Sequence, residues 1–144
     1  MLKQIKEKIL GKSQQHLGPN HSPYDRMGEQ KVRLLANSFY DEMESNPDVA
    51  ELLAIHPQPM DKIRVKFYEF LSGWLGGPDL FVEKYGHPRL RARHLPFQID
   101  HNMYVQWMTC MQAALSKVLQ DDPVLKADLR VKFDQLARHM INQD

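Results

Sequence analysis

The chain has 144 residues, of which 19 are Lys or Arg and 18 are Asp or Glu, so its net charge is +1 with histidine neutral. A chain of this length fits one domain whose core buries roughly two-thirds of the surface exposed by the unfolded chain. The balanced charge excludes a strong global field, and we therefore expect neither nucleic acid nor an anionic membrane as a partner.

Cys110 is the only cysteine, so the chain cannot form an intramolecular disulfide, which fits a cytoplasmic protein. Residues 1–10 alternate charged and aliphatic side chains and lack the continuous apolar run of a secretory signal. Their aliphatic residues share one face of a short helix, and residues 14–23 form a polar connector. We predict an N-terminal extension over residues 1–23 and one domain over residues 24–144. Near-neutral charge and the lack of a heptad seam favour a monomer without a membrane span.

Apolar residues recur at spacings of three and four in four segments, which is the period of an amphipathic helix. The predicted long helices cover residues 28–45, 60–75, 100–119 and 122–141. Residues 48–56 are predicted as a short helix or turn, and Gly76-Gly77-Pro78 ends the second long helix. Residues 79–94 are predicted as an extended loop with one or two short turns. Because no segment alternates with period two, the fold class is all-α.

His94 carries the strongest functional signal because it lies on a short segment between Pro88 and Pro96 and follows Arg91 and Arg93. Haem iron takes an axial imidazole, and haem propionates favour guanidinium partners. A lone histidine near an apolar stretch is nevertheless more often a surface or satisfied core residue than a metal ligand. A haem-free helical bundle acting as an interaction module therefore remains an alternative.

The chain resembles the group II (O-type) truncated haemoglobins, bacterial members of the 2/2 globin family, over roughly residues 24–142. The motifs that carry the resemblance, in family order, are Phe39-Tyr40, Phe70-Leu71, Gly76-Gly77-Pro78, Gly86-His87-Pro88, the segment from Arg91 to Phe97, Trp107, Cys110-Met111 and Arg138-His139-Met140. The resemblance implies the two-over-two helical sandwich of an abbreviated globin, here with an N-terminal pre-helix extension. It also implies haem b as the cofactor.

The same resemblance implies roles for individual residues. His94 matches the proximal iron ligand, Tyr40 reaches over the distal face, and Trp107 donates its indole N–H toward a bound ligand. His56 lies where relatives often have Tyr or Phe, after three extra residues, so it is either an unusual distal histidine or a surface residue that caps the turn before Pro57. Either Tyr40 or His56 is competent to bind ferric iron when no external ligand is present.

The remaining candidates line the cofactor. The apolar lining is predicted to comprise Phe39, Ile63, Phe67, Phe70, Leu90, Phe97, Met103 and Met111. The predicted propionate partners are Lys66, Arg91 and Arg93, with ordinary solvated surface charges as the alternative.

These residues predict a globin that reversibly binds oxygen, NO and CO. Two distal donors slow ligand release, which favours ligand scavenging or redox chemistry such as NO detoxification over bulk oxygen storage. Activity as an NO dioxygenase or a peroxidase-like enzyme needs electrons, and with no flavin or nicotinamide domain expected, any reductase is a separate partner. A haem-based redox or gas-sensing component is the second hypothesis.

Overall fold

The computed structural model describes residues 21–143, and every regular element in that range is a helix, as predicted. The elements in chain order are α2 (Pro23–Met27), α3 (Glu29–Ser45), the 3-10 helix η2 (Pro47–Val49), α4 (Ala50–Ala54), α5 (Asp61–Trp74), α6 (Leu80–Tyr85), α7 (Leu90–His94), α8 (His101–Val118) and α9 (Pro123–His139). The predicted N-terminal helix, and the connector as far as residue 20, lie outside the described residues.

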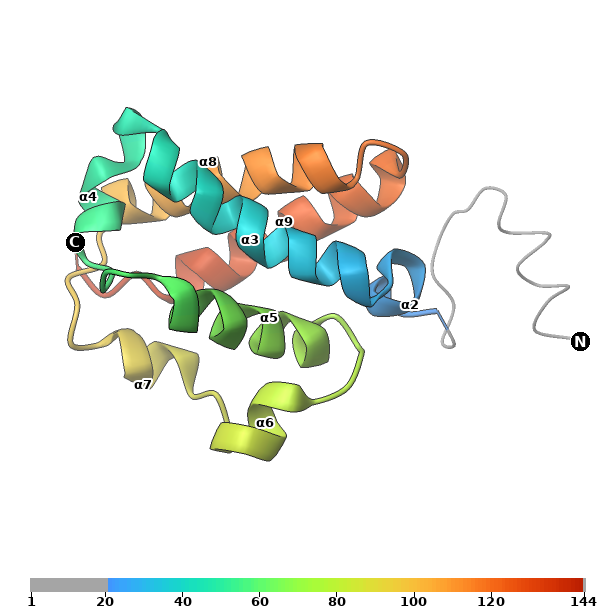
Figure 1. Ribbon diagram of the computed structural model, residues 1–144. Helices are drawn as coiled ribbons and strands as arrows, with labels where there is room; N and C mark the ends of the chain where they lie inside the picture. The colour runs from blue at the N-terminus through green and yellow to red at the C-terminus, as the bar shows by residue number, and fades with distance from the viewer. Residues whose placement is uncertain (1–20, 144) are drawn as a thin grey trace, which may run out of the picture.

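The four long helices form two layers (Figure 1). α3 packs against α5 and against α8, and α8 also packs against α9. The predicted apolar stripe of α3 is buried, with Val32, Leu35, Phe39 and Met43 each at most 1% exposed. No helix in the described chain combines the length and the apolar character that crossing a membrane requires.

The first helix of the described residues, α2, is absent from the predicted elements although its sequence carries a start signal. The Ser22 hydroxyl accepts a hydrogen bond from the Asp25 amide, and the Asp25 carboxylate accepts one from the Ser22 amide. Pro23 occupies the first helical position, where its missing N–H costs nothing. Arg26 then donates two hydrogen bonds of 2.6 and 2.7 Å to Asp122, which caps α9. The pair ties α2 to the body of the domain.

The predicted stop after α5 is confirmed, and two glycines explain it. Gly76 has a φ of +97°, which a residue with a side chain adopts only with strain. A Cβ on Gly76 would lie 2.5 Å from the Cβ of Ser22, and one on Gly77 would lie 2.4 Å from the Tyr24 ring. Both positions therefore need glycine so that the segment entering α2 can pack against the end of α5.

The prediction of an extended segment over residues 79–94 is wrong, because most of that region is helical. α6 and α7 lie there, separated by Gly86 at a φ of +85°. Arg89, at a φ of +45°, precedes α7, and the Arg93 guanidinium donates to the Pro88 carbonyl. Helices of five and six residues are too short to display the apolar period that revealed the long helices.

Candidate functional site

His94 is the last residue of α7, and its ring orientation is fixed from within that helix. Its Nδ1 lies 2.7 Å from the carbonyl oxygen of Leu90, one turn earlier. Because a carbonyl only accepts, Nδ1 carries a proton, and in the neutral imidazole the lone pair therefore lies on Nε2. A histidine whose one ring nitrogen donates to a carbonyl while the other stays unprotonated has the arrangement of a metal ligand.

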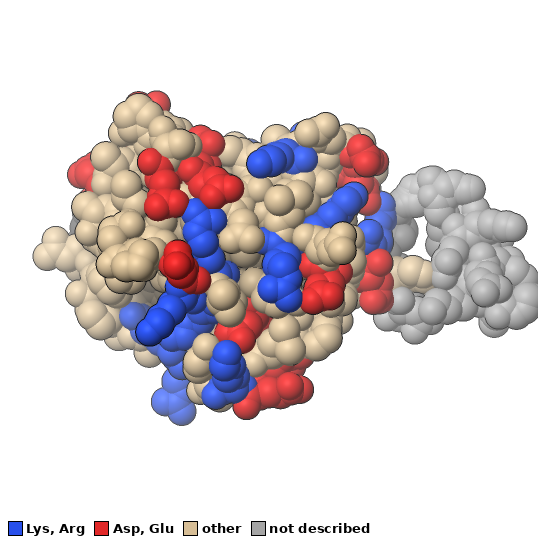
Figure 2. All heavy atoms as spheres, viewed as in Figure 1, with Lys and Arg blue, Asp and Glu red and all other residues tan. Residues whose placement is uncertain are grey.

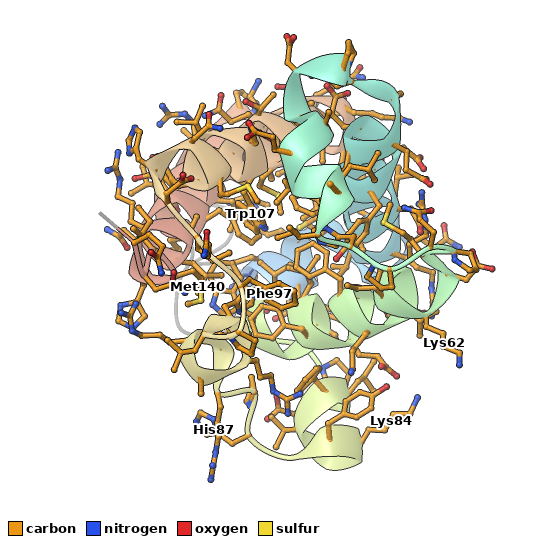
Figure 3. The ribbon with its side chains drawn as sticks, turned by 90° about the vertical axis from the view of Figure 1, so that its left-hand side faces the viewer. Lys62, Lys84, His87, Phe97, Trp107 and Met140 are labelled. Atoms are coloured by element: carbon orange, nitrogen blue, oxygen red, sulfur yellow. The ribbon has the colours of Figure 1, made fainter. Side chains whose placement is uncertain are left out.

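A group of half-buried apolar side chains, here called the apolar cluster, packs on the core from α5, α8, α9 and the chain just after α9. Its members are Ile63, Phe67, Phe70, Trp74, Met103, Trp107, Leu136 and Ile141. Phe70 stacks between Phe67 and Trp74, with ring centroids 6.4 Å apart in each pair. In Figure 3, Trp107, Phe97 and Met140 lie around one open region beside α7. Aromatic surface left half-exposed in this way suits a large, flat apolar ligand.

The eight predicted lining residues divide by burial. Phe39 and Met111 are sealed in the core, at 1% and 0% exposure. Phe39 lies behind the apolar cluster, with its ring 5.0 Å from Phe67 and 5.1 Å from Trp107. The six that keep an exposed part are Ile63, Phe67, Phe70, Leu90, Phe97 and Met103.

Tyr40 and Trp107 supply polar groups next to the apolar cluster. Tyr40 is 4% exposed, and its ring lies edge-on to Phe39. Burial raises the pKa of the Tyr40 phenol, with Arg64 acting in the opposite direction, so the phenol remains an O–H donor at neutral pH. Across residues 21–143, neither the Tyr40 hydroxyl nor the Trp107 indole N–H has a hydrogen-bond partner. Neither atom is sealed from the surface, because the only enclosed side-chain polar atom without a partner in the described residues is the Ser38 hydroxyl, so both donors stay open to a ligand.

His56 lies beside Tyr40, with their rings 5.9 Å apart. Its Nδ1 donates to the Leu52 carbonyl at 2.8 Å, so it caps its own short helix while its ring lies against Tyr40. Burial lowers the pKa of His56, the bond to Leu52 opposes this, and the nearby His94 lowers it further. Neutral His56 therefore presents an unprotonated Nε2, which accepts a hydrogen bond or binds a metal but does not donate.

Gln106 supports this region and was missed at the sequence level. Its side chain is buried, accepts a hydrogen bond from the Leu52 amide at 2.9 Å and donates to Glu51 at 3.0 Å. It thereby ties α8 to the helix that leads into His56. The only signal for it was an amide side chain directly before Trp107.

The three predicted propionate partners all contact other protein groups. Arg91 donates to the carbonyls of His139 and Ile141 at 2.6 and 3.1 Å. Arg93 lies 5.2 Å from the Phe81 ring, and Lys66 lies 4.8 Å from the Tyr85 ring. None of the three cations pairs with a carboxylate in the described chain. Their charges remain available to an acidic ligand.

Several known proteins resemble this chain in sequence and in fold. A family model of bacterial-like globins matches residues 22–142. The Group 2 truncated hemoglobin YjbI of Bacillus subtilis (strain 168) is 37% identical over 123 residues, 85% of this chain and 90% of that protein. The cold-adapted truncated hemoglobin of Pseudoalteromonas haloplanktis TAC125 matches with a TM-score of 0.83 and 51% identity, over 85% of this chain and 99% of the other. The truncated oxygen-avid haemoglobin of Bacillus subtilis gives 0.77 and 36%, over 85% and 100%.

The chain therefore belongs to the bacterial-like globin family. Within that family its relatives are group II truncated haemoglobins, so both the predicted resemblance and the predicted two-over-two fold are confirmed. Family membership implies haem and gas binding. The residues fit such a group, since His94 offers a free Nε2, the apolar cluster offers aromatic surface, and two donors lack partners.

Proposed function

We propose that the chain holds haem b with His94 as the proximal ligand, and binds oxygen and other diatomic gases tightly, for scavenging or redox chemistry such as NO detoxification. The observation that carries this proposal is the pair of unpartnered donors, the Tyr40 hydroxyl and the Trp107 N–H, beside the apolar cluster. Haem supplies the iron that binds the gas, and these two residues set how firmly it is held. The relative described as oxygen-avid supports the same reading.

Charge explains the expected slow release. Haem would supply an iron on which dioxygen carries partial negative charge, and the Tyr40 O–H and the Trp107 N–H would stabilise that charge as fixed donors. A hydrogen bond to a charged group contributes about 1.5–3 kcal/mol, which slows escape by about ten- to a hundredfold per donor. Slow escape is a poor property for oxygen storage or delivery and a useful one for chemistry on the held ligand.

We also rank the proposed contacts with the cofactor by the burial and the hydrogen bonds of the residues that would make them. We place the six half-exposed lining residues against its faces, with Phe39 and Met111 as a supporting layer behind them. Among the propionate candidates, Lys66 has no hydrogen bond within the described chain, whereas Arg91 and Arg93 each bind a carbonyl. Lys66 would therefore lose the fewest contacts on binding a haem propionate.

The function is tested by mixing the oxygenated ferrous protein with one equivalent of NO in a stopped-flow spectrometer. We expect ferric protein within the mixing dead time and one nitrate per haem, because both oxygen atoms of the held dioxygen pass to NO while ferrous iron gives up one electron. Oxygenated protein without NO is the control for autoxidation. Simple replacement of dioxygen by NO, without nitrate, would contradict NO detoxification and favour a gas-sensing role.

Repeated turnover needs an electron donor, which we propose is a separate reductase with an acidic surface. Residues 84–99 contain Lys84, Arg89, Arg91 and Arg93 and no carboxylate, although the whole chain has a net charge of only +1. In Figure 2, several Lys and Arg side chains lie at the lower left of the molecule, the corner where Figure 1 places the start of α5 and α7. Opposite charge steers two proteins into encounter before short-range contacts form. The proposed setting is the cytoplasm, with the globin as a monomer.

We further propose that His56, rather than Tyr40, binds ferric iron when no external ligand is present, since its Nε2 is unprotonated whereas burial keeps the Tyr40 phenol protonated. The parent protein should then show a low-spin ferric spectrum from about pH 5 to pH 9. His56→Ala should convert it to a high-spin spectrum, and Tyr40→Phe should leave it low-spin. A parent spectrum typical of five-coordinate or water-bound ferric haem at every pH would refute this assignment. So would a low-spin spectrum that is lost only in Tyr40→Phe.

A further inference from the structure

The C-terminal residues of the described chain lie against the segment that joins α7 to α8 (Figure 1). Asn142 makes the central contacts. Its side-chain amide donates to the carbonyls of His94 and Phe97 at 3.3 and 3.1 Å, and its side-chain oxygen accepts from the Ile99 amide at 2.9 Å. Its backbone amide donates to the Ile99 carbonyl at 2.9 Å. Every kind of donor and acceptor that the Asn142 side chain possesses is therefore used on this segment.

Arg91 adds a second connection from the opposite direction. Its guanidinium donates to the carbonyls of His139 and Ile141. His139 ends α9, so its carbonyl is one of those at a helix terminus that lack intrahelical partners, and Ile141 follows two residues later. A cation at that end is also favoured by the helix dipole. Arg91 and Asn142, with the carbonyl and amide groups that they bind, are here called the C-terminal clasp.

Besides this clasp, α7 is held by little more than the contacts of Arg93 with the Pro88 carbonyl and the Phe81 ring. None of its five residues is buried, and Leu90 and His94 are only half-buried. An isolated helix of five residues is not stable by itself, since nucleating a helix costs more free energy than the hydrogen bonds of one turn recover. The apolar packing that fixes α3 or α8 is thus missing at the helix that carries the proximal histidine.

We infer that the C-terminal clasp positions His94, with Asn142 as the positioning residue. The Leu90 carbonyl holds the His94 ring, and the Asn142 side chain holds the backbone carbonyl of His94. Together these contacts set the direction in which Nε2 points and how far it projects from α7. This inference rests on the proposed role of His94 as the iron ligand. It gives the end of the chain a role in setting the strength of the bond between His94 and iron, in addition to its role in holding the fold together.

The test compares three full-length proteins: the parent, Asn142→Ala and Gln143→Ala. Gln143 is exposed and engages Ile99 only through its backbone amide, so its substitution is a matched control for a change at the chain end. One measurement is the rate of trypsin cleavage after Arg91 and Arg93 in the protein as purified, relative to cleavage after Arg33 and Lys117. The other is the iron–histidine stretching band of the ferrous haem protein by resonance Raman spectroscopy.

Asn142→Ala removes three side-chain hydrogen bonds, so we expect cleavage after Arg91 and Arg93 to rise about tenfold while cleavage at the other two sites is unchanged. The iron–histidine band should shift or broaden, and Gln143→Ala should match the parent in both measurements. Unchanged cleavage, or an unchanged band with cleavage raised equally at all four sites, would overturn the positioning role. A parent protein that took up no haem would instead overturn the proposed function, and the trypsin result would still report whether Asn142 holds α7.

Discussion

The His94→Ala protein is expected to lose haem to an acceptor globin at least about a hundredfold faster than the parent. Changing a residue that merely orients a metal ligand already costs about ten- to a hundredfold in affinity, and this substitution removes the ligand itself. No buried residue of α7 can compensate, because the helix contributes none. The expected spectrum has a weakened Soret band that no longer gives the parent's shift on addition of carbon monoxide to the reduced protein.

The measurement is the ultraviolet–visible spectrum, ferric and then dithionite-reduced, with and without carbon monoxide, together with the rate of haem transfer. His101→Ala is the matched control, because His101 is an exposed histidine at the start of α8. Added imidazole should partly restore the His94→Ala spectrum by filling the vacated coordination position. If His94→Ala and the parent gave the same spectra and transfer rates, His94 would not be the ligand. If neither protein took up haem, the helical interaction module would become the leading reading.

The long helices were predictable because in each of them apolar residues recur at helical spacing over an element of 14 residues or more. α6 and α7 were not, since neither spans two turns. α2 is an intermediate case, because the pattern from Ser22 to Asp25 is a capping signal that predicts a helix without any periodicity. Local chemistry at helix ends thus carries information that apolar spacing does not.

The residues of the site were likewise predictable from the sequence only in part. His94 and Trp107 could be singled out from motifs, but the tautomer of His94 depends on a carbonyl one turn earlier, in a helix that the sequence did not reveal. Gln106 bonds to a residue 54 positions away, and Asn142 to residues 43 to 48 positions away. A single sequence contains no pattern that pairs such distant residues, so these supporting contacts emerge only from the fold.

Trp107→Phe is expected to speed dioxygen dissociation by about ten- to a hundredfold, which is the effect of losing one hydrogen bond of about 1.5–3 kcal/mol to a charged ligand. Phenylalanine keeps an aromatic ring against Phe39 and Phe133, so the substitution removes the N–H while preserving most of the packing. Carbon monoxide takes on much less negative charge than dioxygen, and its dissociation should change far less. This difference separates a lost hydrogen bond from a general loosening of the region.

Stopped-flow displacement of dioxygen measures the rate, and Trp74→Phe is the control, since that tryptophan stacks on Phe133 at 4.5 Å within the same apolar cluster. Tyr40→Phe and the double variant complete a cycle. If both donors bond the same dioxygen, the two effects should not add, because each donor polarises the ligand that the other stabilises. Strict additivity would mean that the two groups act on it independently. An off-rate unchanged in Trp107→Phe would remove Trp107 from the distal site and leave Tyr40 as the donor that controls release.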